Sequence, residues 1–110
     1  NIMEWIGDLE LSGESYEFDL FRLEYNPENK RYRIGTDSGC SCPSPFEDGR
    51  GEFVDNLSYR QALALLDAEM AGSTVRHQGW FVDAHRSLRQ RLNEHGKERP
   101  VDRREGCACR

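Results

Sequence analysis

The sequence predicts an α+β domain in which an antiparallel β-hairpin or small meander is followed by two α-helices. Apolar and polar residues alternate over residues 16–36, as they do in half-buried strands. Apolar residues then recur at helical spacing from Tyr59 to Met70 and again from Trp80 to His95. Between these segments, residues 37–52 are rich in cysteine, proline and glycine, which predicts a loop between the sheet and the helices.

The β-hairpin is predicted from two alternating segments, residues 16–25 and 31–36, which flank a turn. Residues 26–30 read Asn-Pro-Glu-Asn-Lys, and each of these residue types favours a turn or tolerates one. Residues 5–11 are rich in apolar side chains and are compatible with a further short strand, which Gly13 would end.

The alternation inside the hairpin slips by one residue. Residues 16–20 keep one parity, whereas Phe21, Leu23 and Tyr25 continue on the other. A slip of one residue moves every later side chain to the opposite face of the sheet. Either a β-bulge at Leu20 and Phe21 re-aims the chain, or both faces of this strand are covered.

Both helices carry start or stop signals. Ser58 and Gln61 are spaced as in a capping box, and Gly72 is placed to end the first helix. The second helix is predicted to end at Gly96. In the preceding loop, Phe46 is the large apolar residue, and we expect it to pin the loop to the core.

The 110 residues correspond to one domain. We assign residues 1–96 to this domain and interpret residues 1–2, which precede Met3, as a cloning remnant. Residues 97–110 form a polar, basic tail that we expect to be ordered only if its cysteines are bridged or metal-bound. No apolar run approaches the ~20 residues that span a bilayer, and no export signal is visible, so we expect a soluble protein.

All four cysteines lie in two Cys-x-Cys pairs, and they are Cys40, Cys42, Cys107 and Cys109. Four thiolates can hold one zinc ion tetrahedrally, so we predict a structural zinc site that ties the loop to the tail. The one-residue spacing is a weaker signal than the usual two to four residues. Three alternatives stay open: disulfides such as Cys40–Cys107, reduced surface thiols, and a mixed site completed by His77, His85 or His95.

Charge is distributed unevenly. Residues 1–75 contain fifteen acids and six bases, whereas residues 76–110 contain nine bases and five acids. The simplest interpretation is a basic C-terminal helix that lies against an acidic sheet. The alternative is a nucleic-acid-binding surface, because phosphate contacts need clustered basic side chains. Its candidate residues are Arg86, Arg89, Arg91, Arg99, Arg103 and Arg104.

Catalytic signatures are not found in the sequence: it contains no phosphate-binding loop, dinucleotide-binding fingerprint, nucleophile elbow or zinc-protease motif. Glu17, Asp19 and Glu24 lie on the predicted hairpin, where a solvated strand face is the plain interpretation. We therefore expect that the protein is not an enzyme.

The segment Gly-Cys-Ser-Cys-Pro-Ser-Pro-Phe-Glu, residues 39–47, is unusual. Together with the aromatic-rich hairpin before it, it resembles a family of small uncharacterised proteins that are encoded by bacteriophages of actinobacteria. The resemblance covers about a third of the chain and excludes the second cysteine pair. It implies the cytoplasm of a bacterial host, where thiols stay reduced, and it brings no catalytic residue with it.

We therefore expect a small phage-encoded accessory protein that acts by binding a host protein, with a structural zinc ion. The acidic N-terminal half would complement a basic partner surface. Exposed aromatic side chains commonly anchor such interfaces, and the candidates are Trp5, Phe46 and Trp80. The alternative is a nucleic-acid-binding accessory protein that uses the basic C-terminal helix and tail.

Overall fold

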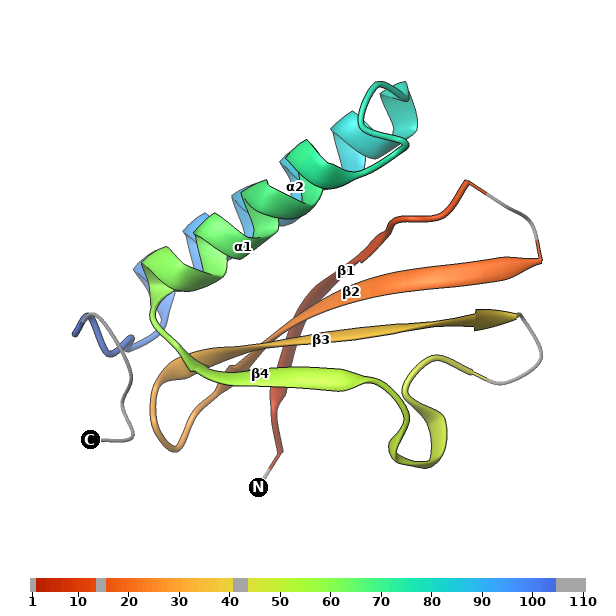
Figure 1. Ribbon diagram of the computed structural model, residues 1–110. Helices are drawn as coiled ribbons and strands as arrows, with labels where there is room; N and C mark the ends of the chain where they lie inside the picture. Colours follow the sequence, from red (N-terminus) through yellow and green to blue (C-terminus); the bar gives the residue numbers. More distant parts are fainter. Residues whose placement is uncertain (1, 14–15, 41–43, 105–110) are drawn as a thin grey trace.

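Four antiparallel strands and two helices form an α+β fold in the computed structural model, which describes residues 2–13, 16–40 and 44–104 (Figure 1). The strands follow one another across the sheet in the order β1-β2-β3-β4. Their bounds are β1 (Glu4–Glu10), β2 (Glu17–Asn26), β3 (Arg31–Cys40) and β4 (Glu52–Leu57), and the helices are α1 (Tyr59–Gly72) and α2 (Gly79–Glu98). The predicted fold class is confirmed, and the sheet extends the predicted hairpin into a four-stranded meander.

The β2–β3 hairpin is confirmed with an unbroken register, from Glu17 opposite Cys40 to Asn26 opposite Arg31. Asn26 shapes the turn, because its side-chain oxygen accepts the Glu28 N–H at 2.9 Å and its carbonyl oxygen accepts the Lys30 N–H at 2.8 Å. The turn chemistry of the sequence is therefore satisfied locally.

Both edge strands are irregular. The pairing of β1 with β2 shifts between Trp5 and Gly7, and the pairing of β3 with β4 shifts between Tyr32 and Ile34. On β4 the shift coincides with Asn56, whose φ of 60° is unusual for a residue other than glycine. Bulges of this kind blunt the edges of a sheet against pairing with another strand.

Helix α1 begins as predicted. The Gln61 N–H donates to Ser58 Oγ at 3.1 Å, and the Ser58 N–H donates to Gln61 Oε1 at 2.8 Å, which completes the capping box. The helix ends at the predicted Gly72.

The prediction that Gly96 ends the second helix is wrong, because α2 continues to Glu98. Gly96 is buried against the ring of Tyr59, where an added Cβ would lie 2.8 Å from Tyr59 Cε1. The glycine therefore permits a close approach between two helices rather than a change of direction.

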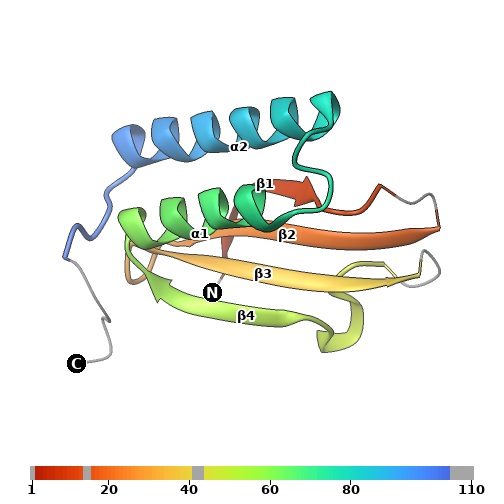
Figure 2. The same cartoon turned by 45° about the horizontal axis from the view of Figure 1, so that its top comes forward.

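The main core lies between one face of the sheet and the two helices, which run side by side over it (Figure 2). Helix α2 packs against β1, and α1 packs against β3 and β4. The core residues with no exposed surface are Leu23, Tyr25, Ala62, Leu66, Phe81 and Leu92. None of the helices in the described ranges is both long and apolar enough to cross a membrane.

The two faces of the sheet are covered at opposite ends. At the end near the β2–β3 turn, Phe21, Leu23 and Tyr25 are buried beneath the helices. At the other end, here called the open end, Phe18 and Leu20 are buried on the opposite face.

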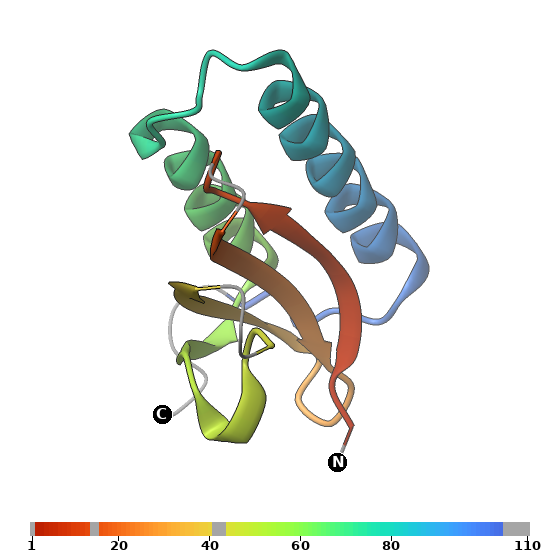
Figure 3. The ribbon, with the colours of Figure 1, turned by 90° about the vertical axis from the view of Figure 1, so that its right-hand side faces the viewer.

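The cover at the open end comes from the loop before β4, which lies on the side of the sheet away from the helices (Figure 3). The Phe46 N–H donates to Asp37 Oδ2 at 2.8 Å, and the Arg50 guanidinium lies 5.8 Å from the Phe18 ring centre. The parity slip in β2 is therefore explained by cover on both faces, and the unbroken β2–β3 register excludes a bulge between these strands.

The C-terminal segment differs from its prediction as far as it is described. Residues 97–98 belong to α2, and residues 99–104 lie against the hairpin turn. The Asp102 N–H donates to the Lys30 carbonyl oxygen at 2.9 Å, and the Tyr25 hydroxyl donates to the Pro100 carbonyl oxygen. Cys107 and Cys109 lie outside the described residues, so the dependence of the tail on its cysteines remains a prediction.

Candidate functional site

The helix-facing side of the sheet is hollowed at the open end, where the helices and the sheet diverge (Figure 1). One hollow of about 670 Å³ lies between the strand ends and the α1–α2 turn. A second, of about 420 Å³, continues toward β4, and the two share Asp19 and Ser38. We call them together the open-end groove. Its lining includes Leu11–Gly13, Glu17, Asp19, Thr36, Ser38, Cys40, Glu52, Thr74 and Val75.

The lining of the groove is acidic. Glu17, Asp19 and Glu52 contribute carboxylates, and no lysine, arginine or histidine occurs among the described lining residues. Glu69 of α1 adds a fourth carboxylate, which interacts electrostatically with Asp19. Within the described part of the chain, no ion pair involves any of these four groups. Asp37 also belongs to the lining, but it pairs with Leu20 on the opposite face of the sheet and forms an ion pair with Arg50 at 3.7 Å.

Electrostatics at the groove disfavour further negative charge. Burial raises the pKa of Asp19, and the neighbouring Glu10 carboxylate raises it further. Burial also raises the pKa of Glu69, with a smaller contribution from Asp19. Glu10 cannot move away easily, because its carboxylate accepts the N–H groups of Ser12 and Asp19 at 3.1 and 2.8 Å. A cation in the groove would relieve this repulsion.

Val54 is an exposed apolar side chain close to the acidic groove, because it lies on the same face of β4 as the lining residue Glu52. Val54 pairs with Ile34, so it lies on the helix-facing side of β4, and it is 51% exposed. Apolar side chains next to charged groups are typical of surfaces that contact other proteins.

The opposite face of the sheet is different, because its arginines are satisfied internally. Arg22 pairs with Asp8 at 2.8 Å and lies 4.7 Å from the centre of the Phe46 ring. Arg33 pairs with Glu24 at 2.7 Å and lies 4.2 Å from the Phe53 ring centre. Glu24 therefore has an arginine partner, whereas Glu17 and Asp19, which the sequence analysis grouped with it, form no ion pair within the described residues.

The three predicted aromatic anchors do not form one surface. Trp5 is 53% exposed on β1, where its indole N–H donates to Asp8 and Arg91 lies 5.6 Å from its ring centre. Trp80 is 46% exposed at the start of α2 and contacts Phe81 edge-on.

Phe46 does pin its loop, but to the outer face of the sheet rather than to the core between sheet and helices. Its ring lies 5.5 Å from that of Phe53 and fills the space over Gly35. Phe46 is only half-buried there, so it contributes both to packing and to the molecular surface.

Every arginine proposed for nucleic-acid binding has an intramolecular partner. The pairs are Arg86 with Asp83, Arg89 with Asp67, Arg99 with Glu4, Arg104 with Asp102, Arg91 with the Ile6 carbonyl and Arg103 with the Gly96 carbonyl. Three of these acids, Glu4, Asp67 and Asp83, belong to the sheet and helices. Of these four ion pairs, only Arg99 with Glu4 reaches the sheet, so the interpretation of a basic helix against an acidic sheet is supported by that pair alone.

The predicted zinc site lies mostly outside the described residues. Cys40 ends β3, is exposed and lines the open-end groove. Cys42, Cys107 and Cys109 are not among the described residues. Within the described ranges, no group of three or more histidine, cysteine, aspartate or glutamate side chains is placed to hold a metal ion.

Two of the three candidate histidines have other contacts. His95 Nε2 lies 2.6 Å from Glu4 Oε1, and its Nδ1 lies 2.9 Å from the Tyr32 hydroxyl. His85 is buried, with Nε2 at 3.2 Å from Asp67 Oδ1. Both therefore connect structural elements of the fold.

Comparison with known proteins identifies a family without an assigned role. The family model described as "Domain of unknown function (DUF7574)" matches residues 2–98, which span all four strands and both helices. No curated protein and no solved structure matches the chain.

Proposed function

Because the chain belongs to the DUF7574 family, whose description assigns no activity, we propose its function from the geometry: the protein binds a basic segment of another protein in the open-end groove. The observation that carries this proposal is the set of four carboxylates, Glu17, Asp19, Glu52 and Glu69, at a hollowed sheet face. A partner lysine or arginine would complement these charges.

Two features favour binding in the groove over other modes. The bulges in β1 and β4 oppose the addition of a partner strand at either edge. The arginines of the opposite face already pair with Asp8 and Glu24, so their charges are compensated. In addition, the exposed Val54 would add apolar contact area beside the groove.

The resemblance of residues 39–47 to phage-encoded proteins extends the proposal to the partner's origin. We infer that the partner is a protein of an actinobacterial host and that binding alters its activity. In this setting a structural zinc ion held by the four cysteines would organise the loop beside the groove, since Cys40 lies at its rim. The nucleic-acid alternative gains no support from the six arginines, which have intramolecular partners.

Affinity capture from a host lysate tests the proposal with three immobilised full-length baits. The first is the wild type, and the second is the double variant Asp19→Asn/Glu69→Gln, which removes two groove charges. The third, Glu28→Gln/Glu98→Gln, removes two charges from exposed positions outside the groove and is the matched control. We expect one host protein to be retained by the wild type and by the control. The groove variant should retain less of it.

The retained protein is then purified, and its affinity for each bait is measured at several salt concentrations. The groove variant should bind more weakly and with a shallower salt dependence, because fewer charge pairs form. Equal retention by all three baits would contradict binding in the groove. Background retention by a folded wild-type bait would contradict protein binding altogether.

A further inference from the structure

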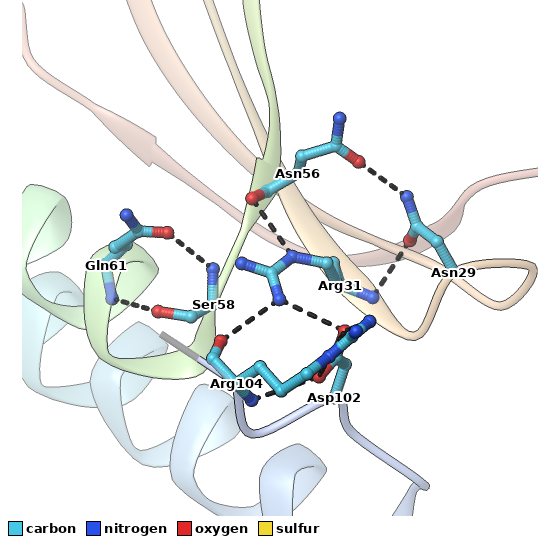
Figure 4. A network of polar contacts seen from close by, with 7 residues as sticks. All are labelled: Asn29, Arg31, Asn56, Ser58, Gln61, Asp102 and Arg104. Atoms are coloured by element: carbon cyan, nitrogen blue, oxygen red, sulfur yellow. Dashed lines mark hydrogen bonds and ion pairs between the residues drawn. The ribbon is translucent and has the colours of Figure 1, made fainter. Parts of the chain in front are cut away.

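Arg31 is buried at the end of the sheet away from the groove. Arg31 is 1% exposed and is among the largest fully buried side chains of the described residues. Its Nε donates to the Asn56 carbonyl oxygen at 3.1 Å (Figure 4). Its Nη1 donates at 3.1 Å both to Asp102 Oδ2 and to the Arg104 carbonyl oxygen.

The guanidinium of Arg31 is oriented by residues outside the C-terminal segment that it contacts. Asn29 Oδ1 accepts the backbone N–H of Arg31 at 3.0 Å, and the Asn29 side-chain amide donates to Asn56 Oδ1 at 2.8 Å. Asn56 in turn holds Nε of the guanidinium. We call Asn29, Arg31 and Asn56 the Arg31 cradle. The hairpin turn and the edge strand β4 hold these residues in place. Arg31 Nη1 is therefore pre-organised for its contacts with the C-terminal segment.

Residues 100–104 occupy the Arg31 cradle as an extended peptide ligand would. Their backbone is held at Asp102, whose N–H donates to the Lys30 carbonyl oxygen, and at Pro100, whose carbonyl oxygen accepts the Tyr25 hydroxyl. Val101 packs against the core, and the Asp102 carboxylate meets Arg31. The contacts thus select an apolar residue followed by an aspartate.

We propose that the Arg31 cradle is a recognition site for an extended segment of another chain that presents an apolar residue followed by an aspartate, and that residues 100–104 fill it in cis. Removing the carboxylate without replacement would take an ion-pair partner away from a buried guanidinium, which is costly, so the site favours an occupant. A segment tethered this closely has an effective concentration in the millimolar range. A segment of the same chemistry on another chain therefore competes in two cases only. Either the cis contact is weakened, or the segment of the other chain binds more tightly than residues 100–104. This site is independent of the groove and recognises a carboxylate rather than a basic side chain.

The replacement of the cis segment by a peptide is tested on the full chain with the substitution Asp102→Asn. This substitution keeps the shape of the segment but removes the charge of the Asp102 carboxylate. The probe is a fluorescein-labelled peptide, Pro-Val-Asp-Arg-Arg, with the sequence of residues 100–104, and binding is read by fluorescence anisotropy. We expect the peptide to bind the variant about tenfold more tightly than the wild type, as the loss of one charged hydrogen bond predicts. Hydrogen exchange at the amide of residue 102 should accelerate in the variant when the cis segment is released.

A second peptide, with asparagine in place of the aspartate, is the matched control and should bind at least about tenfold more weakly. The variant Arg31→Lys keeps the charge but loses the planar fork, and it should lose the preference for the aspartate peptide. If that variant fails to fold, the asparagine peptide still decides the role of the carboxylate. Absence of binding to a folded Asp102→Asn protein, or equal binding of the two peptides, would overturn the proposal.

Discussion

At the scale of single residues, the charged side chains divide into two sets within the described ranges, those that form an ion pair with another described residue and those that do not. Arg22, Arg33 and Arg89 each have a carboxylate partner within 3.1 Å. Asp19 and Glu69 are instead near other carboxylates, and the pKa of each is raised. Exposed ion pairs contribute little to stability, so the unpaired carboxylates are the more informative feature.

The raised pKa of Asp19 predicts how the substitution Asp19→Asn affects stability with pH. Between the unfolded pKa, about 3.9, and the higher folded value, the native state binds more protons, so stability falls as pH rises through this window. Above the window the charge of Asp19 destabilises the fold, and asparagine removes that charge. We expect Asp19→Asn to increase the free energy of unfolding at pH 7, and this gain to shrink as pH falls through the window.

Urea unfolding of both proteins between pH 3 and pH 8 measures this difference. Asp55→Asn is a suitable comparison, because Asp55 is exposed and lies 3.9 Å from Arg33, so its replacement should not stabilise the fold. A gain for Asp19→Asn that is constant across this pH range would refute the electrostatic explanation.

Asp102 shows the opposite behaviour at the far end of the sheet. Hydrogen bonds from Arg104, with a further contribution from Arg31, hold the pKa of Asp102 well below its usual range. A depressed carboxyl pKa favours folding at every pH above the unfolded value and loses this effect only as pH falls toward the folded one. Because Arg104 belongs to the same segment as Asp102, only the smaller contribution from Arg31 links the protonation of Asp102 to the docking of the cis segment.

At the scale of secondary-structure elements, close packing of the two helices depends on a glycine. The ring of Tyr59, at the start of α1, lies where a side chain at position 96 of α2 would be. The same two helices are also joined by the ion pair between Arg89 and Asp67 and by a hydrogen bond from Tyr59 to Asn93.

The substitution Gly96→Ala should destabilise the protein by about 1–3 kcal/mol, because its Cβ would overlap the Tyr59 ring and force the helices apart. Gly72→Ala is the control: Gly72 also lies in a helix, and a Cβ added there meets nothing within 4 Å. Alanine at position 72 should change stability by less than ~1 kcal/mol, in the stabilising direction. Urea denaturation measures both, and equal effects would contradict the packing role of Gly96.

At the scale of the whole molecule, the sheet is covered on each face over only part of its length. The helices cover the face and end that carry Leu23 and Tyr25, whereas the loop around Phe46 covers the opposite face at the open end. The open-end groove is what this diagonal arrangement leaves uncovered. A zinc ion shared by the cysteine pairs would connect this loop to the C-terminus.

Metal content tests that connection. Protein purified without chelator should contain about one zinc ion per chain by elemental mass spectrometry, since four thiolates fill one tetrahedral site. Cys107→Ser should lower both the zinc content and the thermal stability, because metal binding contributes to folding. Ser87→Ala, at an exposed position on α2, is the control and should change neither. A folded, metal-free wild type would refute the zinc site.

Features whose contacts are local could be predicted from the sequence. The capping box of Ser58 and Gln61 and the turn that begins at Asn26 are formed by residues within a few positions of one another, so their chemistry is visible in the sequence. Alternation along the strands and helical periodicity likewise identified the fold class, because each reflects the geometry of one element.

What covers each element could not be predicted in this way, because it depends on contacts between distant segments. The parity slip in β2 was visible, but the choice between a bulge and two covers depends on a loop and on helices that lie far along the chain. Gly96 was misinterpreted because its purpose is to accommodate Tyr59, and Arg31 gave no sign of its contact with Asp102. Local hydrogen bonding and periodicity are properties of short segments, whereas burial and charge pairing depend on which distant residues fill the remaining space.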